Sequence, residues 1–244
     1  MRKEAVALLP DRKKSTILKW ILCGLLLGSL FFPGCDPNGN EEKSVTLPDS
    51  TGTGTDTLGH RQLKNILFFG NSITAGFGLD SLARFTTLVQ QKIDSLNLPY
   101  KTLNSGLPGE TTAGGETRID GVLATPFNIF VLELGGNDGL QKLSVTAMTK
   151  NLQTIIDKVK NKYPTCKIIL AGMQVPANLG QTYTSAFKAV FPQLAANDSL
   201  YFIPFLLDGV GGILSLNQAD GIHPNVQGEK IVADNVWKIL QPLL

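Results

Sequence analysis

Four short polar segments of the chain carry side chains that could perform acyl-transfer chemistry. Residues 70–72, 106–111 and 135–138 each follow an apolar run, and residues 220–225 precede the last segment with helical spacing. Together they offer a serine hydroxyl, amide donors, a carboxylate and an imidazole. A nucleophile, a base that is oriented by an acid, and donors for a developing negative charge are what such chemistry needs, provided that the fold brings them together.

The histidine content narrows the choice of general base, because the chain has only His60 and His223. His60 lies in a polar segment with almost nothing to bury, so an imidazole base must be His223. Asp220 lies three residues earlier. One loop could therefore hold its carboxylate against the ring, fix the tautomer and stabilise the imidazolium. A lone histidine near a helix start is also commonly a surface or capping residue, so the catalytic interpretation depends on Ser72.

Ser72 follows a predicted strand, in the stretch Gly70-Asn71-Ser72. Gly70 permits a tight exit from the strand, and the helix start beyond it would offer backbone N–H groups to an anion. The alternative is an ordinary serine at a helix N-cap. Rival motifs do not fit: Thr74 stands where a nucleophile elbow needs glycine, there is no Walker phosphate loop, and Gly70 and Gly78 lack the dinucleotide-binding spacing.

The elements that must position these residues alternate along the chain from residue 64 onward. Apolar runs of strand length occupy residues 65–70, 100–104, 129–134, 167–173 and 201–205. The segments between them repeat apolar residues three or four apart, as a helix with one buried face does. Five strands alternating with about five helices predict an α/β fold, a three-layer αβα sandwich with a flavodoxin-like, doubly wound, five-stranded parallel sheet. Ligands bind at the carboxyl ends of the strands in such sheets.

These motifs, in this order, give the chain a family resemblance. It resembles the SGNH (GDSL-type) hydrolases at residues 70–73, Gly109, residues 135–138 and residues 220–224, and the likeness covers residues 65–244.

Within that family the chain is most similar to the bacterial acyl-CoA thioesterase, lysophospholipase and arylesterase subfamily. Residues 132–140, 175–180 and 220–225 carry this finer resemblance. Asn71 and Ile73 differ from the Asp and Leu of the family name, but neither position carries the nucleophile.

The resemblance implies a role for each site residue. Ser72 would be the nucleophile, His223 the base and Asp220 the group that orients the base. The backbone N–H groups of Ser72 and Gly109 and the side-chain amide of Asn137 would form the oxyanion hole. Preorganised donors of this kind are each worth about 3 kcal/mol to the transition state.

Two of the oxyanion assignments have alternatives. Gly106 competes with Gly109 in the alignment of the second motif, and Gly109 could be an ordinary turn glycine. Asn137 could cap a loop. Asp138 is interpreted as structural, because Asp220 is the better-placed acid.

The N-terminus has the pattern of an export signal. Six basic and two acidic residues lie in the first 20 positions, and residues 20–32 are uncharged and mostly apolar. Thirteen residues are too few to span a bilayer as a helix, which needs roughly 20. The Gly34-Cys35 pair resembles a bacterial lipobox, although Phe32 and Pro33 depart from its usual residues. Cys35 is the predicted lipidation site, and a plain secretory signal or an uncleaved anchor are the alternatives.

The predicted organisation is therefore a signal peptide with a lipobox at residues 1–35, a flexible linker at residues 36–62 and an SGNH hydrolase domain at residues 63–244. The linker is rich in Gly, Thr, Ser, Asn and Asp, with almost nothing to bury. We expect an exported protein of the cell envelope, held to a membrane by a lipid. A periplasmic or secreted protein is the alternative.

Charge and cysteine content exclude several classes of function. The formal net charge of the chain is +2, but residues 21–244 hold 16 basic and 18 acidic residues and no basic stripe, which argues against a nucleic-acid partner. Cys166 is the only cysteine after residue 35, and its place before an apolar run suggests an inert core thiol. One usable histidine and one cysteine suggest no metal site, and we expect no cofactor.

The predicted function is that of a serine esterase that hydrolyses acyl esters or thioesters of small or lipid substrates through an acyl-enzyme on Ser72. A carbohydrate O-deacetylase of the same superfamily is the first alternative, and an anchored binding module without turnover is the second. Residues 174–190 and 206–219 are expected to wall the substrate groove, with Leu179, Tyr183 and Phe187 in contact with the acyl chain.

Overall fold

The computed structural model describes residues 63–244. The predicted signal peptide, Cys35 and the linker lie outside the described residues. The strands are β1 (Lys64–Gly70), β2 (Tyr100–Gly106), β3 (Ile129–Glu133), β4 (Lys167–Ala171) and β5 (Tyr201–Ile203).

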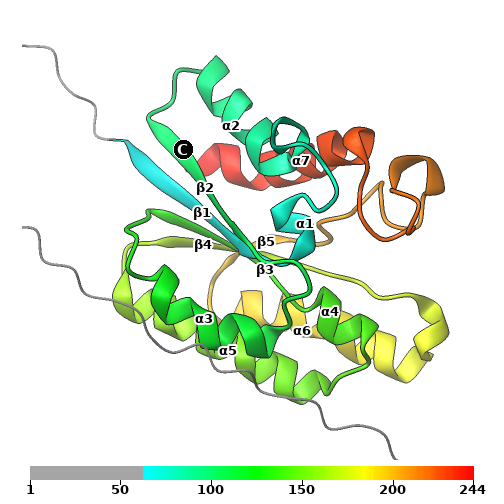
Figure 1. Cartoon of the computed structure of the whole chain (residues 1–244). Coiled ribbons are helices and arrows are strands. Elements are labelled where there is room, and N and C mark those ends of the chain that lie inside the picture. Colours follow the sequence, from blue (N-terminus) through cyan, green and yellow to red (C-terminus); the bar gives the residue numbers. More distant parts are fainter. Residues whose placement is uncertain (1–62) are drawn as a thin grey trace, which may run out of the picture. The chain divides into compact units, whose positions relative to one another are not determined.

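All five strands form one parallel sheet in the order β2-β1-β3-β4-β5 (Figure 1). This is the flavodoxin-like order, in which the direction of winding reverses between β1 and β3. The predicted α/β class and five-stranded parallel sheet are thus confirmed.

The two central strands explain why the apolar runs could be recognised in the sequence. Residues 66–70 of β1 and all five residues of β3 are buried. Helices cover both faces of a parallel sheet, so its central strands show continuous apolar runs rather than an alternating pattern.

Seven α-helices surround the sheet within residues 63–244. They are α1 (Ser72–Ala75), α2 (Phe85–Ser95), α3 (Thr112–Val122), α4 (Gly136–Leu140), α5 (Val145–Lys162), α6 (Gln181–Asn197) and α7 (Val226–Leu240). Four short 3₁₀ turns are η1 (Ser81–Ala83), η2 (Ala177–Leu179), η3 (Leu214–Leu216) and η4 (Gln241–Leu243).

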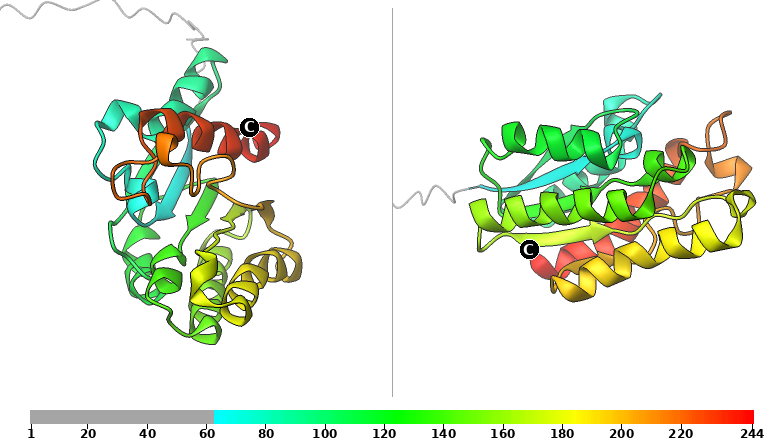
Figure 2. Two further views of the ribbon diagram at one scale, coloured as in Figure 1. Left: turned by 90° about the vertical axis from the view of Figure 1, so that its right-hand side faces the viewer. Right: turned by 90° about the horizontal axis from the view of Figure 1, so that it is seen from below.

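The helices divide into two layers. In Figure 1, α2 and α7 lie above the sheet and α3, α5 and α6 lie below it. The view from below in Figure 2 shows α3, α5 and α6 side by side across that face, and contacts join α3 to α5 and α5 to α6. The expected three-layer arrangement is therefore the one observed.

Helix α5 illustrates how the apolar spacing sets the packing. Its buried residues are Met148, Leu152, Ile155, Ile156 and Val159, the set that the spacing predicts. The Ser144 side chain begins the helix by accepting a hydrogen bond from the N–H of Ala147.

β2 runs two residues beyond its predicted end, to Gly106, whereas β4 and β5 stop short of theirs. Both strands end two residues earlier than their apolar runs. The proline at position 204 has no N–H to continue the ladder after Ile203. Residues 172–176 and 204–207 are thereby left in loops beyond the sheet edge.

None of the helices that the structure describes is long and apolar enough to cross a membrane.

Candidate active site

The turn from β1 into α1 carries the nucleophile candidate. Asn71 is the N-cap of α1, and its side-chain oxygen accepts the N–H of Ile73 at 3.0 Å. Because Asn71 satisfies the helix end, the Ser72 side chain is free for another role. The alternative interpretation of Ser72 as the capping residue is therefore wrong.

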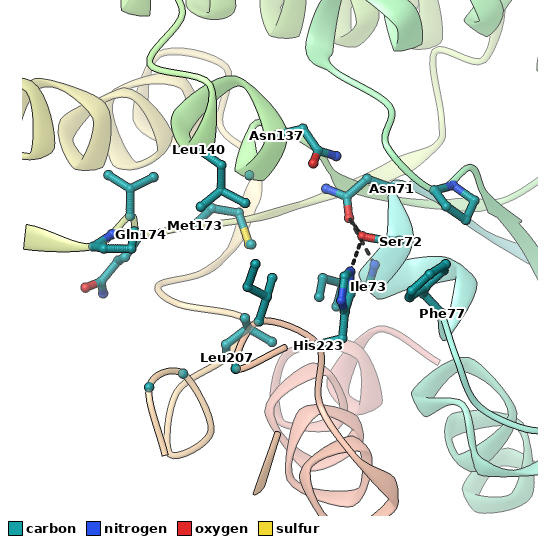
Figure 3. Close-up of a pocket in the computed structure, with 18 of the residues that line it drawn as sticks. Asn71, Ser72, Ile73, Phe77, Asn137, Leu140, Met173, Gln174, Leu207 and His223 are labelled. Carbon is teal, nitrogen blue, oxygen red and sulfur yellow. Dashed lines mark hydrogen bonds between the residues drawn. The ribbon is translucent and has the colours of Figure 1, made fainter. Parts of the chain in front are cut away.

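The hydroxyl of Ser72 is hydrogen-bonded to the imidazole of His223. Ser72 Oγ and His223 Nε2 are 2.8 Å apart, and the other ring nitrogen, Nδ1, is 2.7 Å from Asp220 Oδ2 (Figure 3). Ser72 from the first motif and Asp220 and His223 from the last thus form one hydrogen-bonded chain. With Asp220 accepting from Nδ1–H, the Nε2 lone pair faces the serine.

Asp220 also organises the loop that carries the histidine. Its Oδ1 accepts the backbone N–H groups of Ile222 and His223 at 2.9 and 3.0 Å. Partial burial alone would raise the pKa of Asp220, but hydrogen bonds from the His223 ring and from these two N–H groups, together with the histidine charge, lower it to about 2. The carboxylate is therefore ionised at neutral pH and can stabilise a protonated imidazole.

The three residues that would supply the oxyanion hole share one cavity. Ser72, Gly109 and Asn137 all line it. The backbone N–H groups of Ser72 and Gly109 make no hydrogen bond within residues 63–244. The side-chain amide of Asn137 donates to the carbonyl of Glu110 at 2.9 Å, which fixes its direction and leaves its second N–H available.

Gly106 and Gly109, which compete for the second motif, have different surroundings. A Cβ on Gly106 would lie 2.2 Å from the backbone nitrogen of Ala75, because the end of β2 packs directly against α1. Gly109 lies in the cavity wall at a φ of +80°, a conformation that favours glycine, with open space where a Cβ would be. Gly109 is therefore the oxyanion candidate, and Gly106 is required for packing.

The cavity beside Ser72 has a volume of about 550 Å³ and mostly apolar walls. Figure 3 shows Leu140, Met173 and Leu207 on one side of Ser72 and Phe77 on the other. The apolar residues that line it are Ile73, Phe77, Pro108, Leu140, Met173, Val175, Pro176, Phe205, Leu207 and Ile222. Many come from the loops after β4 and β5, which the early strand ends leave beside the loop that carries Asp220 and His223, here called the catalytic loop.

Comparison with known proteins agrees with this geometry. A model of the GDSL-like Lipase/Acylhydrolase family matches residues 68–231, which include β1 and the catalytic loop. The chain belongs to this family.

Individual proteins that are similar to this acylhydrolase support the same family assignment. The chain is 36% identical over 182 residues to Esterase TesA of Pseudomonas aeruginosa, covering 74% of this chain and 90% of the relative. It is 33% identical over 182 residues to the Thioesterase 1/protease 1/lysophospholipase L1 of Escherichia coli K12, covering 73% and 84%. The crystal structure of TesA matches with a TM-score of 0.71 at 36% identity, over 74% of this chain and all of that one. The predicted family is thus confirmed.

The acylhydrolase differs from the GDSL name at Asn71, and the structure gives a reason. The Asn71 amide nitrogen donates at 2.7 Å to the carboxylate of Glu133, which is buried beneath the turn. An aspartate at position 71 would lack this donor and would bring two acids together. Sequence reasoning missed Glu133, although a carboxylate within the apolar run of residues 129–134 is a signal that could have found it.

The predicted acyl contacts of the acylhydrolase need correction, since the lining of the cavity contains none of Leu179, Tyr183 and Phe187. Phe187 is fully buried and packs against Phe191, because that face of α6 points into the core. The Tyr183 hydroxyl donates to the carbonyl of Leu143 at 2.9 Å. Leu179 lies in η2, beyond the loop residues that reach the cavity.

An ion pair that sequence reasoning also missed supports the oxyanion side of the acylhydrolase site. The Arg118 guanidinium binds both carboxylate oxygens of Glu110, at 2.7 and 2.5 Å, and lies over the ring of Phe69. The backbone carbonyl of the same Glu110 holds the Asn137 amide. The loop that contains Gly109 is thereby fixed to α3 and to α4.

Asp138 has the structural place that was expected of it. Its carboxylate accepts both the N–H and the hydroxyl of Thr112, at 2.8 and 2.5 Å, and so joins α4 to the start of α3.

Cys166 is partly buried, and burial raises its pKa to about 12, which keeps it a protonated thiol. Residues 63–244 hold no cluster of three or more His, Cys, Asp or Glu side chains suited to a metal ion.

Proposed function

We propose that this chain is a serine esterase that hydrolyses acyl esters or thioesters through an acyl-enzyme on Ser72. The observation that carries the proposal is the continuous hydrogen-bonded chain from Ser72 through His223 to Asp220 at the edge of an apolar cavity. A binding module would have no need of this arrangement. The names of the relatives, esterase and thioesterase/lysophospholipase, support the same reaction class.

In the first half of the reaction, His223 Nε2 takes the proton of Ser72 as Oγ attacks the carbonyl carbon. The carbonyl electrons move onto oxygen, where the N–H groups of Ser72 and Gly109 and the amide of Asn137 stabilise them. When the intermediate collapses, the C–O or C–S bond to the leaving group breaks. The imidazolium, stabilised by Asp220, returns its proton to the departing alcohol or thiol.

In the second half, His223 removes a proton from water, and the resulting hydroxide attacks the acyl carbon. A second tetrahedral intermediate forms at the same donors and collapses by breaking the bond to Ser72 Oγ. The serine recovers its proton from the imidazolium, and the carboxylic acid leaves. Both halves use the same three side chains, so one site is sufficient for the whole cycle.

The apolar walls support an acyl chain as the group that the cavity holds. Each methylene removed from water contributes about 0.8 kcal/mol, so activity should rise with chain length until the cavity is full. We therefore expect hydrolysis of p-nitrophenyl esters, measured from acetate to palmitate, to peak at medium chains. Leu140→Trp, which narrows the cavity at a partly exposed wall residue, should lower kcat/KM for octanoate about tenfold and for acetate hardly at all.

Leu143→Trp is the matched control, because Leu143 is similarly exposed but does not line the cavity. Equal effects of the two substitutions on octanoate would contradict an acyl-binding role for the cavity. Turnover of acetate alone would favour the carbohydrate O-deacetylase, and acetylated xylan would then be the next substrate to test. Absence of turnover on every ester would favour the anchored binding module.

We further propose that the protein is exported and held in the cell envelope by a lipid on Cys35. The support is the sequence alone: a basic start, a short apolar segment and a glycine before the cysteine. Cells that express the chain with an alkyne-labelled palmitate should yield a labelled protein, and Cys35→Ser should abolish the label. Cys23→Ser is the control and should retain it. A label that survives in Cys35→Ser would contradict the anchor.

A further inference from the structure

Glu133 is a buried acid that the reaction itself does not use. It ends β3, lies beside Gly70 in the sheet and is 1% exposed. Its Oε2 accepts the N–H of Asn71 at 3.1 Å and both the N–H and the hydroxyl of Thr74 at 3.2 and 2.8 Å. Its Oε1 accepts the side-chain amide of Asn71 at 2.7 Å. All four donors belong to the residues that bracket the nucleophile.

The hydrogen bond between Glu133 and Asn71 affects the surroundings of Ser72. With its nitrogen on Glu133, the Asn71 amide must direct its oxygen the other way, where it accepts the N–H of Ile73 at 3.0 Å and lies 3.4 Å from Ser72 Oγ. The carboxylate therefore determines which end of the Asn71 amide faces the serine. It also fixes the first turn of α1 through Thr74.

We propose that Glu133, in its ionised form, is a positioning residue that holds the nucleophile turn in the geometry that lets Ser72 meet His223. This inference rests on the proposed function and adds a pH-dependent control of the same site. A carboxylate can accept all four hydrogen bonds, whereas a protonated carboxyl would direct its own O–H at a donor.

The surroundings of Glu133 bring its titration close to neutral pH. Burial raises its pKa, against the hydrogen bonds from Thr74 and Asn71, to about 7. Three charged or titratable groups lie on elements next to this turn: Glu229 on α7, whose charge interacts with Glu133 and with Arg84 before α2, and His223, which binds Ser72. Burial raises the pKa of Glu229 to about 7 as well, and the nearby charge of Glu133 adds to this shift.

Ionisation of Glu133 has opposite consequences for stability and for activity. Its pKa is higher in the folded chain than in the unfolded chain, so its stabilising contribution is present below about pH 4.5 and is lost as the pH rises through about 7. The positioning role requires the ionised form, so its contribution to turnover grows over the same interval. A residue that only stabilised the fold would not make turnover rise over the pH interval in which stability falls.

The test compares Glu133→Gln with the unaltered full chain on p-nitrophenyl butyrate from pH 5 to pH 8.5. Glutamine keeps the shape but directs an amide donor at Asn71 or Thr74, as a protonated carboxyl would. At pH 8 we expect kcat to fall about 10- to 100-fold with KM unchanged, because a small displacement of the nucleophile is enough for such a loss. At pH 5 the two proteins should converge, since Glu133 is then protonated in the unaltered chain.

Two further variants keep the test interpretable. Glu229→Gln replaces a second buried acid whose carboxylate accepts the N–H of Phe85 rather than a donor of the nucleophile turn, so its kcat at pH 8 should equal that of the unaltered chain. Thr74→Val removes one of the four donors at nearly constant shape, so its kcat at pH 8 should fall by less than that of Glu133→Gln. It provides the test if Glu133→Gln does not fold. A ratio between Glu133→Gln and the unaltered chain that stays constant across pH would overturn the inference.

A measurement without substrate separates this inference from the proposed function. In ¹⁵N spectra of the Ser72→Ala chain, the backbone amides of Asn71 and Thr74 should titrate together between pH 5 and 8, and the titration should disappear when Glu133→Gln is added. Unchanged amide positions over that interval would refute the role of Glu133 whether or not the protein hydrolyses esters. If the amides titrate as expected but the unaltered chain, with Ser72 in place, hydrolyses no ester, only the proposed function would be refuted.

Discussion

Replacing Ser72 with alanine is expected to lower the kcat for p-nitrophenyl ester hydrolysis by about five to six orders of magnitude. The substitution removes the Oγ that forms the acyl-enzyme in the proposed mechanism and leaves His223 and Asp220 in place without a nucleophile. The fold should survive, because Asn71 rather than Ser72 caps α1 and because alanine is smaller than serine at this buried position. Steady-state rates together with a thermal melt would show both effects.

Asn137→Ala is the informative comparison for this first result. It removes one oxyanion donor but leaves the nucleophile in place, so kcat should fall only about 10²- to 10³-fold. Mass spectrometry should still detect the acyl-enzyme in Asn137→Ala and not in Ser72→Ala. Turnover by Ser72→Ala within tenfold of the unaltered chain would exclude the proposed mechanism.

The second large effect is expected for the stability of Gly106→Ala. The new Cβ would lie 2.2 Å from the nitrogen and 2.7 Å from the Cα of Ala75, both backbone atoms that no side-chain rotation can move away. Relieving this overlap must push α1 away from β2. We expect the free energy of unfolding to fall by about 3 kcal/mol, at the upper end of the range for overpacked cores. Turnover should also fall about 100-fold, because α1 carries Ser72.

Gly121→Ala provides the matched control for Gly106→Ala. Gly121 lies inside α3, and a Cβ there would have nothing within 4 Å. Alanine should therefore stabilise the helix by about 0.5–1 kcal/mol and leave turnover unchanged. Urea unfolding of the three proteins measures the difference. Similar midpoints for Gly106→Ala and Gly121→Ala would show that β2 and α1 are not packed as described.

Sequence reasoning predicted the features that depend on local pattern. The runs that became β1 and β3 are mostly apolar because helices cover both faces of the sheet, and the spacing in α5 matches its buried residues one for one. The grouping of Ser72, Asp220 and His223 followed from the rule that strand ends share one edge and from the presence of a single usable histidine.

The segments that wall the cavity were predicted in part, since residues 174–176, Leu207, Gly211 and Gly212 line it, but the individual acyl contacts were not. The position of Phe187 on α6 is compatible with either a groove or the core, and only the packing of α6 places it against Phe191. Phe205 lies just outside the predicted wall of residues 206–219, and it lines the cavity because β5 ends at Ile203, before Pro204. The predictions for residues 1–62 stay predictions, since those residues lie outside the described part of the chain.

The hydrogen bond between Ser72 and His223 joins residues that are 151 positions apart in sequence. The nucleophile turn belongs to β1 and α1, whereas its base arrives only with the segment between β5 and α7. A contact of such long range cannot form until nearly the whole chain has been synthesised and has collapsed. A nascent or truncated chain can therefore complete the nucleophile turn and still carry an inert serine. Esterase activity of this protein therefore measures the fraction of chains that have folded completely.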